Sequence, residues 1–306
     1  MSRSERARGA LLGLALGDSL GAPFEGRSEV ARSRVDAWID AREPLRWTDD
    51  THMALTLARH LVDDPELDDP KALGAAFARA YASEPWRGYG SGPPQVFAMV
   101  EQGLSFEEAA GTLFGGSGSF GNGAAMRVAP VGLLPAATDP RQAASLVETQ
   151  ARVTHTHPDA IDGATVVAQV IAGLIDLARV EGDAIVRVVS AAASRLSQGP
   201  VRDRLLDVVD VLGSGGEAAT AAERCGTGVA AAESVPAAVA ALLAGGDPLQ
   251  VVRTAIGLGG DTDTIAGMAS AMAGAAWGLE QLPGALLDRL EARAELEQLA
   301  QTLSCR

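Results

Sequence analysis

The chain of 306 residues is long enough for one large domain or two small ones. Hydrophobic residues make up 47% of it but aromatic residues only 4%, so the core is expected to consist mainly of Ala, Leu, Val and Ile, a composition that favours helices. A net charge of −14 repels phosphate backbones and argues against general nucleic-acid binding.

Cysteine usage and hydropathy indicate a soluble protein in a reducing compartment. Cys225 and Cys305 form neither a disulfide framework nor a metal-binding spacing. The stretch GALLGLALG is similar to a short signal peptide, but Glu5 dilutes the basic region before it and Asp18 ends the apolar run. We interpret it as an amphipathic first helix. No other stretch reaches the roughly 20 apolar residues of a membrane span, so we expect a cytoplasmic monomer without membrane contact.

The predicted elements are almost all helices. Residues 5–21 form the first, and Thr48 is expected to cap a second helix through His60, because its hydroxyl can accept from the free N–H groups of the first turn. Proline after a capping residue predicts further helix starts at Asp69-Pro70, Thr156-His157-Pro158, Val235-Pro236 and Asp247-Pro248. Long periodic runs cover 139–153, 158–180, 183–197, 201–212, 262–279 and 284–302.

Other features favour one all-α domain over residues 1–306. There is no sustained two-residue alternation, no internal repeat and no convincing domain boundary, although GSGG at 213–216 predicts a loop. Asn122-Gly123 lies in a glycine-rich loop, and the AAMRVAP that follows is expected to be helical.

Two helix starts far apart in the chain are rich in oxygen donors: Thr48, Asp49 and Asp50 in WTDD, and Asp261, Asp263 and Thr264 in GGDTDT. Residues 265–277 carry no charge, so the second helix is expected to be buried on most sides. One interpretation is that these residues only cap two helices, because carboxylates are stabilised at helix N-termini.

If the two starts converge, a metal site is the better interpretation. Four partly buried carboxylates repel one another, and cations or protons must offset that repulsion. Carboxylate and hydroxyl oxygens are ligands for hard cations such as Mg²⁺ or Mn²⁺, and two ions about 3.5–4 Å apart are plausible. Thr262 is interpreted as a spacer, and the glycines before Asp261 as allowing the backbone to approach metals closely.

Three further features have both a functional and a structural interpretation. Five glycines in residues 115–123 can present N–H groups to a diphosphate or form an ordinary loop, in which Phe120 stacks on a nucleoside or pins the loop. His155 and His157 point apart on a helix, so a joint metal site is not expected, whereas His155 alone can contact substrate or be structural. Glu25, by itself, is read as a surface carboxylate.

In this order, the stretches GDSLGAPFEG, WTDDTHMAL, GSFGNGAAMR, VTHTHPDA and GLGGDTDTIAGMA resemble the ADP-ribosylglycohydrolase family. The resemblance spans residues 9 to about 278. It implies a compact orthogonal bundle around two Mg²⁺ or Mn²⁺ ions, with Thr48, Asp49, Asp50, Asp261, Asp263 and Thr264 as ligands. It also implies a mobile Glu25 beside the metals and a diphosphate and ribose loop made of Gly118, Ser119, Phe120, Gly121 and Asn122. His155 matches a substrate-contacting histidine, whereas Tyr89 falls in a variable loop and its role does not carry over.

The resemblance implies a hydrolase that cleaves the C1″ glycosidic bond of ADP-ribose on an arginine or serine of a protein, or on a small-molecule substrate. Positive charge builds on the ribose in such a cleavage. The metals would hold the ribose hydroxyls and a water, and Glu25, Asp50 or Asp261 would move the proton. Two alternatives stay open: a catalytically silent ADP-ribose or nucleotide sensor, and a metal-free protein in which the aspartates only cap helices.

Overall fold

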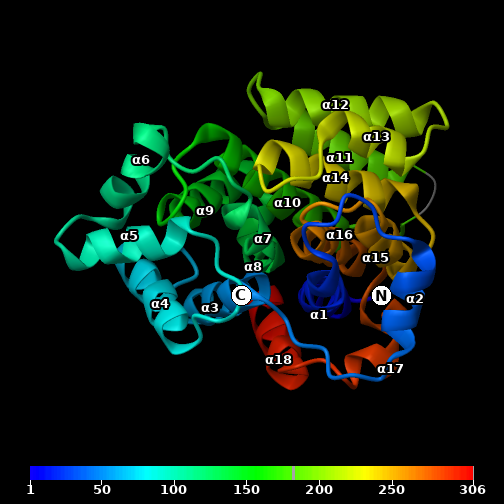
Figure 1. Ribbon diagram of the computed structural model, residues 1–306, viewed down its shortest axis with the longest axis horizontal. Coiled ribbons are helices and arrows are strands. Elements are labelled where there is room, and N and C mark those ends of the chain that lie inside the picture. The colour runs from blue at the N-terminus through cyan, green and yellow to red at the C-terminus, as the bar shows by residue number, and fades with distance from the viewer. Residues whose placement is uncertain (181–182, 306) are drawn as a thin grey trace.

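The computed structural model describes residues 1–180 and 183–305, and within these ranges every extended regular element is a helix (Figure 1). The α-helices are α1 (Arg3–Gly21), α2 (Arg32–Asp40), α3 (Asp49–Asp63), α4 (Pro70–Ser83), α5 (Gly92–Glu101), α6 (Phe106–Gly116), α7 (Gly123–Met126), α8 (Ala129–Leu133), α9 (Pro140–Arg152), α10 (Pro158–Ile175), α11 (Ala184–Arg195), α12 (Pro200–Gly213), α13 (Ala218–Cys225), α14 (Ala231–Ala244), α15 (Pro248–Gly257), α16 (Thr262–Trp277), α17 (Gly284–Leu287) and α18 (Arg293–Ser304). Three 3₁₀ helices are η1 (Ala22–Phe24), η2 (Pro135–Thr138) and η3 (Leu279–Gln281). The predicted all-α class is confirmed.

A closely packed pair of helices, α1 and α16, lies at the centre of the right half of Figure 1. Glycines recur at every fourth position of α1, at 9, 13, 17 and 21, which places them on one face. A Cβ added at Gly17 would lie 2.1 Å from the backbone oxygen of Ala266, and one at Gly13 would lie 2.2 Å from that of Ser270. Only residues without a side chain permit this approach, so the glycines set the position of α16 and of the carboxylates at its start.

The expectation that the helix after GGDTDT is buried is confirmed. Every residue of α16 from Thr262 to Ala276 is buried, and the Thr262 hydroxyl donates a 2.9 Å hydrogen bond to the Gly21 carbonyl on α1. Thr262 therefore faces α1 and is indeed a spacer between the neighbouring aspartates.

Helix α10 is long and apolar enough to cross a membrane, but 67% of its residues are buried inside the protein. It packs against α7, α8, α9, α14 and α16, which makes it the central apolar helix of a globular fold. The periodic run that predicted it extends to residue 180, whereas the helix ends at Ile175.

Most of the predicted helix starts are confirmed. Thr48 caps α3 by accepting from the Asp50 N–H at 3.3 Å. The Asp69 carboxylate caps α4 and the Asp247 carboxylate caps α15, each followed by proline. At α10 the cap is His157, whose Nδ1 accepts from the Asp159 N–H at 3.1 Å.

The start predicted at Val235-Pro236 is wrong, because Pro236 lies inside α14. Proline has no N–H to donate to the carbonyl four residues earlier. Here that carbonyl belongs to Ala232 and accepts a 3.0 Å hydrogen bond from Arg204 Nη1 instead. A side chain from a neighbouring helix thus replaces the missing backbone donor and lets the helix continue.

Two predicted runs are interrupted. The run 284–302 is two helices, α17 and α18, because Leu45 forms backbone hydrogen bonds with Arg289 and Glu291 and Ala292 has a positive φ of 57°. The AAMRVAP stretch forms the two short helices α7 and α8. The prediction of a loop at 213–216 is confirmed between α12 and α13.

Four helices were not predicted as separate elements: α2, α5, α6 and α13. Helix α5 begins at Gly92, just after the segment that carries Tyr89. The two cysteines are unpaired, with Cys225 buried and Cys305 exposed.

Candidate active site

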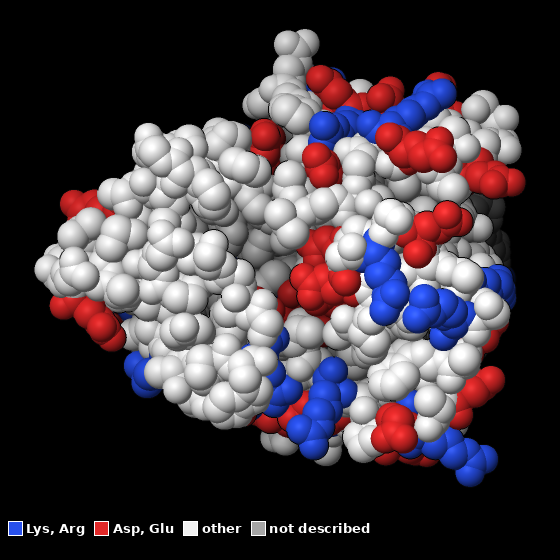
Figure 2. All heavy atoms as spheres, in the orientation of Figure 1, with Lys and Arg blue, Asp and Glu red and all other residues white. Residues whose placement is uncertain are grey.

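The starts of α3 and α16 converge, as the metal-site interpretation requires. One carboxylate oxygen each of Glu25, Asp261 and Asp263 lies within 4.8 Å of the others. Asp50 on α3 is close enough to Asp263 and Asp261 for their charges to raise its pKa. Figure 2 shows acidic side chains gathered at the floor of a hollow near the middle of this face.

The start of α3 is held by Asp18, which the sequence interpretation placed in a motif without giving it a role. Its fully buried carboxylate accepts from the Thr48 N–H at 3.0 Å, from the Thr51 N–H at 3.1 Å and from the Thr51 hydroxyl at 2.6 Å. Burial raises the pKa of Asp18 to about 6 against these hydrogen bonds. Asp18 therefore links α1 to the first turn of α3 and orients the WTDD residues.

The start of α16 is held by backbone contacts from two loops. Gly259 and Gly260 have positive φ values of 75° and 76°, and the Gly260 N–H donates to the Arg27 carbonyl at 2.6 Å. The Asp261 N–H donates to the Thr227 carbonyl at 2.8 Å. A Cβ at Gly260 would lie 2.0 Å from that carbonyl. The glycines thus admit neighbouring backbone, and the expected close approach to metals stays a prediction.

The same contacts place Glu25 beside the aspartates. The Gly26 N–H donates to the Gly260 carbonyl at 2.9 Å, so the turn that carries Glu25 rests on the loop before Asp261. Glu25 is exposed to solvent, whereas Asp261 and Asp263 are each 6% exposed. Burial and the charge of Asp261 raise the pKa of Glu25.

Asp261 occupies the N-cap position of α16, but its side chain makes no capping hydrogen bond. Asp69 and Asp247 do cap their helices with their carboxylates. Asp261 Oδ2 instead accepts a 2.6 Å hydrogen bond from Asn122 Nδ2. The interpretation that the aspartates only cap helices therefore fails for Asp261.

The aspartates are electrostatically strained as a group. Burial, followed by the charges of Asp263 and Asp18, raises the pKa of Asp50 well above its ordinary value. Burial together with neighbouring carboxylates raises the pKa of Asp49 to about 7 and that of Asp263 to about 9. Asp50 Oδ2 is buried without a hydrogen-bond partner in the described part of the chain. Such a cluster is suited to receive positive charge.

The remaining predicted ligands also lie at these helix starts. Thr48 is half-buried at the cap of α3, and Thr264 is buried in the first turn of α16. The Thr264 N–H donates to Asp263 Oδ1 at 2.9 Å. The structure thus gathers the six predicted ligands around the two helix starts, and their roles as ligands stay predictions.

The glycine-rich loop lies next to the carboxylates because α14 holds it there. The Ala231 N–H donates to the Phe120 carbonyl at 3.0 Å, and the Asn122 N–H donates to the Val229 carbonyl at 2.9 Å. The Asn122 side chain is buried against Asp261 and Ser234, so its amide joins the loop to the predicted metal site. Ser119 is also buried, and its hydroxyl accepts from the Gly121 N–H at 3.3 Å.

Two aromatic rings stand exposed at this loop. Phe120 is 43% exposed and Phe114 58% exposed, and their ring centroids are 5.5 Å apart. His157 lies edge-on to Phe120 at 5.9 Å. Phe114 was not predicted as a site residue. Its φ of 53° is rare for an aromatic residue, which marks a constrained conformation beside the glycine-rich stretch.

The four histidines have different surroundings. His155 is buried behind the loop and His157 caps α10, so both precede that helix and the prediction that they point apart on a helix does not apply. His52 is buried with its Nδ1 2.9 Å from the Tyr89 hydroxyl, and His60 pairs with Asp64. Tyr89 thus packs beside the start of α3.

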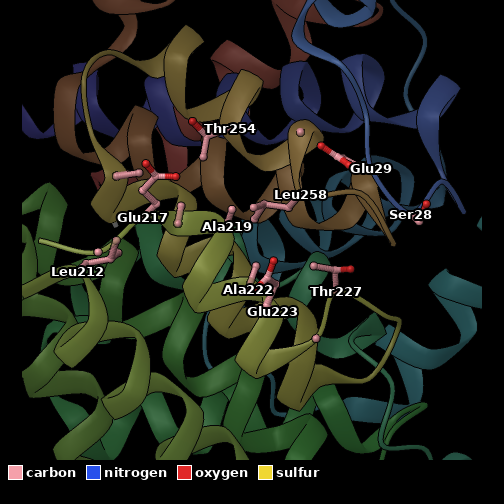
Figure 3. Close-up of a pocket in the computed structure, with 15 residues that line it drawn as sticks. Ser28, Glu29, Leu212, Glu217, Ala219, Ala222, Glu223, Thr227, Thr254 and Leu258 are labelled. Atoms are coloured by element: carbon pink, nitrogen blue, oxygen red, sulfur yellow. The ribbon is translucent and has the colours of Figure 1, made fainter.

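A separate pocket of about 750 Å³ lies between α13, α15 and the segments around Ser28 and Thr227 (Figure 3). Acidic residues Glu29, Glu217 and Glu223 stand on its walls, but none of the predicted metal ligands does. It adjoins the site through the backbone, because the Thr227 carbonyl accepts from the Asp261 N–H.

Comparison with known proteins agrees with this geometry. A family model described as ADP-ribosylglycohydrolase matches residues 1–305. The chain is 32% identical to ADP-ribosylhydrolase ARH3 of Mus musculus, over 97% of this chain and 90% of the mouse protein. It is also 32% identical to the uncharacterized protein YegU of Escherichia coli (strain K12), over 96% of this chain and 94% of that protein.

A solved structure has the same fold along the whole chain. An ADP-ribosylglycohydrolase-related protein complex superposes with a TM-score of 0.76 at 28% identity, covering 99% of this chain and 98% of that one. The chain therefore belongs to the ADP-ribosylglycohydrolase family, and like the ADP-ribosylhydrolases it is similar to, it is an enzyme that hydrolyses a glycosidic bond.

Proposed function

We propose that this enzyme uses two Mg²⁺ or Mn²⁺ ions to remove ADP-ribose from an arginine or serine of a modified protein, by hydrolysis at C1″. The observation that carries the proposal is that Glu25, Asp261 and Asp263 lie together and that the buried Asp50 Oδ2 beside them has no hydrogen-bond partner among the described residues. A cation at that place removes both the mutual repulsion of the carboxylates and the unpartnered oxygen.

The donor set fits hard divalent cations. All the side chains that would hold them offer oxygen: Thr48, Asp49, Asp50, Asp261, Asp263 and Thr264. No cysteine is part of the cluster, and His155 lies behind the glycine-rich loop, so the ligand types favour Mg²⁺ or Mn²⁺ over zinc. Bound ions would supply charge stabilisation and orientation of the ribose hydroxyls and water.

The chain's own residues would bind and orient the nucleotide. Gly118, Ser119 and Gly121 belong to the glycine-rich loop, in which the Gly118 and Gly121 N–H groups donate to the Leu113 carbonyl and the Ser119 hydroxyl. The N–H groups of Ser119 and Phe120 have no acceptor among the described residues and can receive a diphosphate. The exposed rings of Phe114 and Phe120 offer a surface on which an adenine can stack. A diphosphate held in this loop would direct the distal ribose of ADP-ribose toward the carboxylates.

Glu25 is the residue we assign to proton transfer. It is the exposed member of the carboxylate cluster, so it can meet both solvent and an acceptor group. Its raised pKa makes it a better proton carrier near neutral pH than an ordinary glutamate. Asp50 and Asp261 are buried, and Asn122 orients Asp261, so we assign both aspartates to stabilising the positive charge that builds on the ribose.

The test is an acceptor panel with ADP-ribosylated arginine and serine peptides, each with Mg²⁺, Mn²⁺ or EDTA. We expect the release of ADP-ribose to depend on the metal. We also expect release to be faster from one of the two acceptors than from the other. Asp261→Asn should abolish release, whereas Asp247→Asn, at the cap of α15, should not. Release that is equal in EDTA contradicts the metal proposal. Tight binding of ADP-ribose without turnover of any acceptor favours the sensor alternative.

A further inference from the structure

Arg127 is fully buried behind the glycine-rich loop, five residues after Asn122. Its guanidinium donates from Nε to Gln150 Oε1 at 2.8 Å, from Nη2 to the Gln150 carbonyl at 2.7 Å and from Nη1 to the Thr154 hydroxyl at 2.8 Å. None of these acceptors is a carboxylate, and within residues 1–180 and 183–305 no ion pair to Arg127 is found. A buried cation with only neutral partners is costly, so its position calls for a reason beyond packing.

The Thr154 hydroxyl passes this contact on to His155. Thr154 Oγ1 lies 2.8 Å from His155 Nδ1, and both residues are buried. Arginine can only donate, so the hydroxyl oxygen accepts from Arg127. The single proton of the Thr154 hydroxyl then has one acceptor among the described residues, the Nδ1 of His155. The opposite assignment, with the proton on Nδ1, leaves a buried hydroxyl proton without a partner, at a cost of about 1–3 kcal/mol.

The other ring nitrogen of His155 faces the glycine-rich loop. A Cβ added at Gly123 would lie 2.9 Å from His155 Nε2, and one at Gly121 would lie 3.7 Å from it. Both glycines therefore leave room for the ring edge. No protein hydrogen bond to Nε2 occurs in the part of the chain that the structure describes. An N–H on this nitrogen is thus available to a molecule held by the loop.

We propose that Arg127 is a positioning residue that acts through Thr154 to hold His155 as the neutral imidazole with its proton on Nε2, aimed at the glycine-rich loop. Burial, and next the charge of Arg127, lower the pKa of His155 to about 3, which agrees with a neutral ring. Burial lowers the pKa of Arg127 to about 9, so the guanidinium still carries its charge at neutral pH. The consequence for substrate binding rests on the proposed function: the Nε2 N–H of His155 donates a hydrogen bond to the diphosphate or ribose of ADP-ribose.

The direct test is the tautomer of His155 in the free protein, read from the ¹⁵N shifts of its ring nitrogens. The chain has four histidines, so His155→Asn assigns the signal. We expect an N–H at Nε2 and an acceptor at Nδ1 in the wild type and in Thr154→Ser. Thr154→Val should give the other tautomer or a mixture. A wild type protonated on Nδ1, or a Thr154→Val protein with an unchanged tautomer, overturns the proposal.

A second measurement, calorimetric binding of ADP-ribose, separates the relay from a purely structural role. Thr154→Val and Arg127→Met should bind about tenfold more weakly, the effect expected from one hydrogen bond to a charged group, and Thr154→Ser should restore affinity. Arg6→Met is the matched control, because Arg6 is also buried and donates only to helix carbonyls far along the chain from His155. Equal loss in Arg6→Met and Arg127→Met contradicts the relay. Wild type that does not bind ADP-ribose overturns the proposed function, while the tautomer still decides the relay.

Discussion

At the scale of residues, the candidate site is defined by carboxylates whose surroundings disfavour their charge. Asp50 is buried beside four other aspartates, and one of its oxygens has no partner among the described residues. Asn122 stabilises Asp261 by donating a hydrogen bond to its carboxylate. Asp18 accepts from the Thr48 N–H and so holds the backbone next to Asp49. Such an arrangement lowers stability unless a cation or protons bind, and this leads to a prediction about pH.

Without metal, the protein should lose stability as pH rises from about 4 to about 9. The folded-state pKa of Asp49 is raised to about 7 and that of Asp263 to about 9, from an ordinary value of 3.8. A raised carboxyl pKa means that the folded state binds protons more tightly than the unfolded state. The stabilisation that follows is complete when the pH is below the ordinary pKa, and it is lost as the pH rises through the raised pKa. Thermal unfolding in EDTA across this range measures the slope.

The matched variants for that measurement are Asp263→Asn, which removes one titrating group from the cluster, and Asp247→Asn, which removes the charge of an exposed cap but keeps a capping side chain. We expect a shallower slope for Asp263→Asn and the wild-type slope for Asp247→Asn. Identical slopes in all three proteins would show that the cluster does not govern the pH dependence.

A second residue-scale prediction concerns Phe120 and Phe114. Replacing Phe120 or Phe114 with Ala should raise KM for an ADP-ribosylated peptide by about tenfold or more, since stacking of a base on an aromatic ring contributes about 1–3 kcal/mol. The melting temperature should change little, because both rings are exposed. Leu206→Ala, another exposed apolar side chain on α12, serves as control. An unchanged KM would place the adenine elsewhere.

At the scale of elements, the glycine face of α1 decides where α16 lies. The backbones of the two helices approach so closely that a Cβ at Gly9, Gly13, Gly17 or Gly21 would overlap with atoms of α16 or of the turn after it. Because α16 begins with Asp261 at its cap and Asp263 in its first turn, the glycine face also determines the position of the candidate metal site.

Gly17→Ala should therefore lower the free energy of unfolding by about 1–3 kcal/mol through overpacking. The added Cβ would meet the Ala266 oxygen at 2.1 Å. Gly111→Ala is the matched control, because Gly111 lies in α6 and its added Cβ meets nothing within 4 Å. It should be neutral or slightly stabilising. Denaturant unfolding of both variants checks this, and equal effects would mean that the helix pair tolerates separation.

At the scale of the whole molecule, the candidate site joins segments from both ends of the chain. The first segment includes Asp18, Glu25 and the start of α3, and the last is the start of α16, more than 200 residues later. A ligand bound between them stabilises the folded state as a whole, because the unfolded chain cannot bring these segments together.

Mg²⁺ or Mn²⁺ should accordingly raise the melting temperature, with a gain of about 2.7 kcal/mol when the free ion is at 100 times its Kd. Differential scanning calorimetry with and without EDTA measures this, and elemental analysis should find two ions per chain. Asp50→Asn should reduce the gain, whereas Asp247→Asn should keep it. A melting temperature that does not respond to either ion contradicts the metal proposal. Light scattering on the same samples checks the predicted monomer.

Local chemistry allowed much to be predicted from the sequence. Helix starts could be predicted at Thr48, Asp69 and Asp247, because a short polar side chain accepts hydrogen bonds from the free N–H groups of the turn that follows it. The uncharged run 265–277 predicts a buried helix for the same local reason. The ordered motifs also indicated the family, since each motif keeps its residues together in the chain.

Only the tertiary structure decided what depends on contacts between distant segments. The sequence could not distinguish the cap residue Asp261 from Asp247. The two differ because Asn122, 139 positions away in the chain, donates a hydrogen bond to the Asp261 carboxylate. The sequence around Pro236 predicts a helix start. In the structure Pro236 lies inside a helix, because Arg204 from α12 donates to the carbonyl that the proline leaves without a donor. Phe114, Asp18 and Arg127 gain their roles from their neighbours in space. The sequence by itself determined helices, motifs and charge, which are short-range properties, whereas packing of α1 on α16 determined that two acidic helix starts form one site.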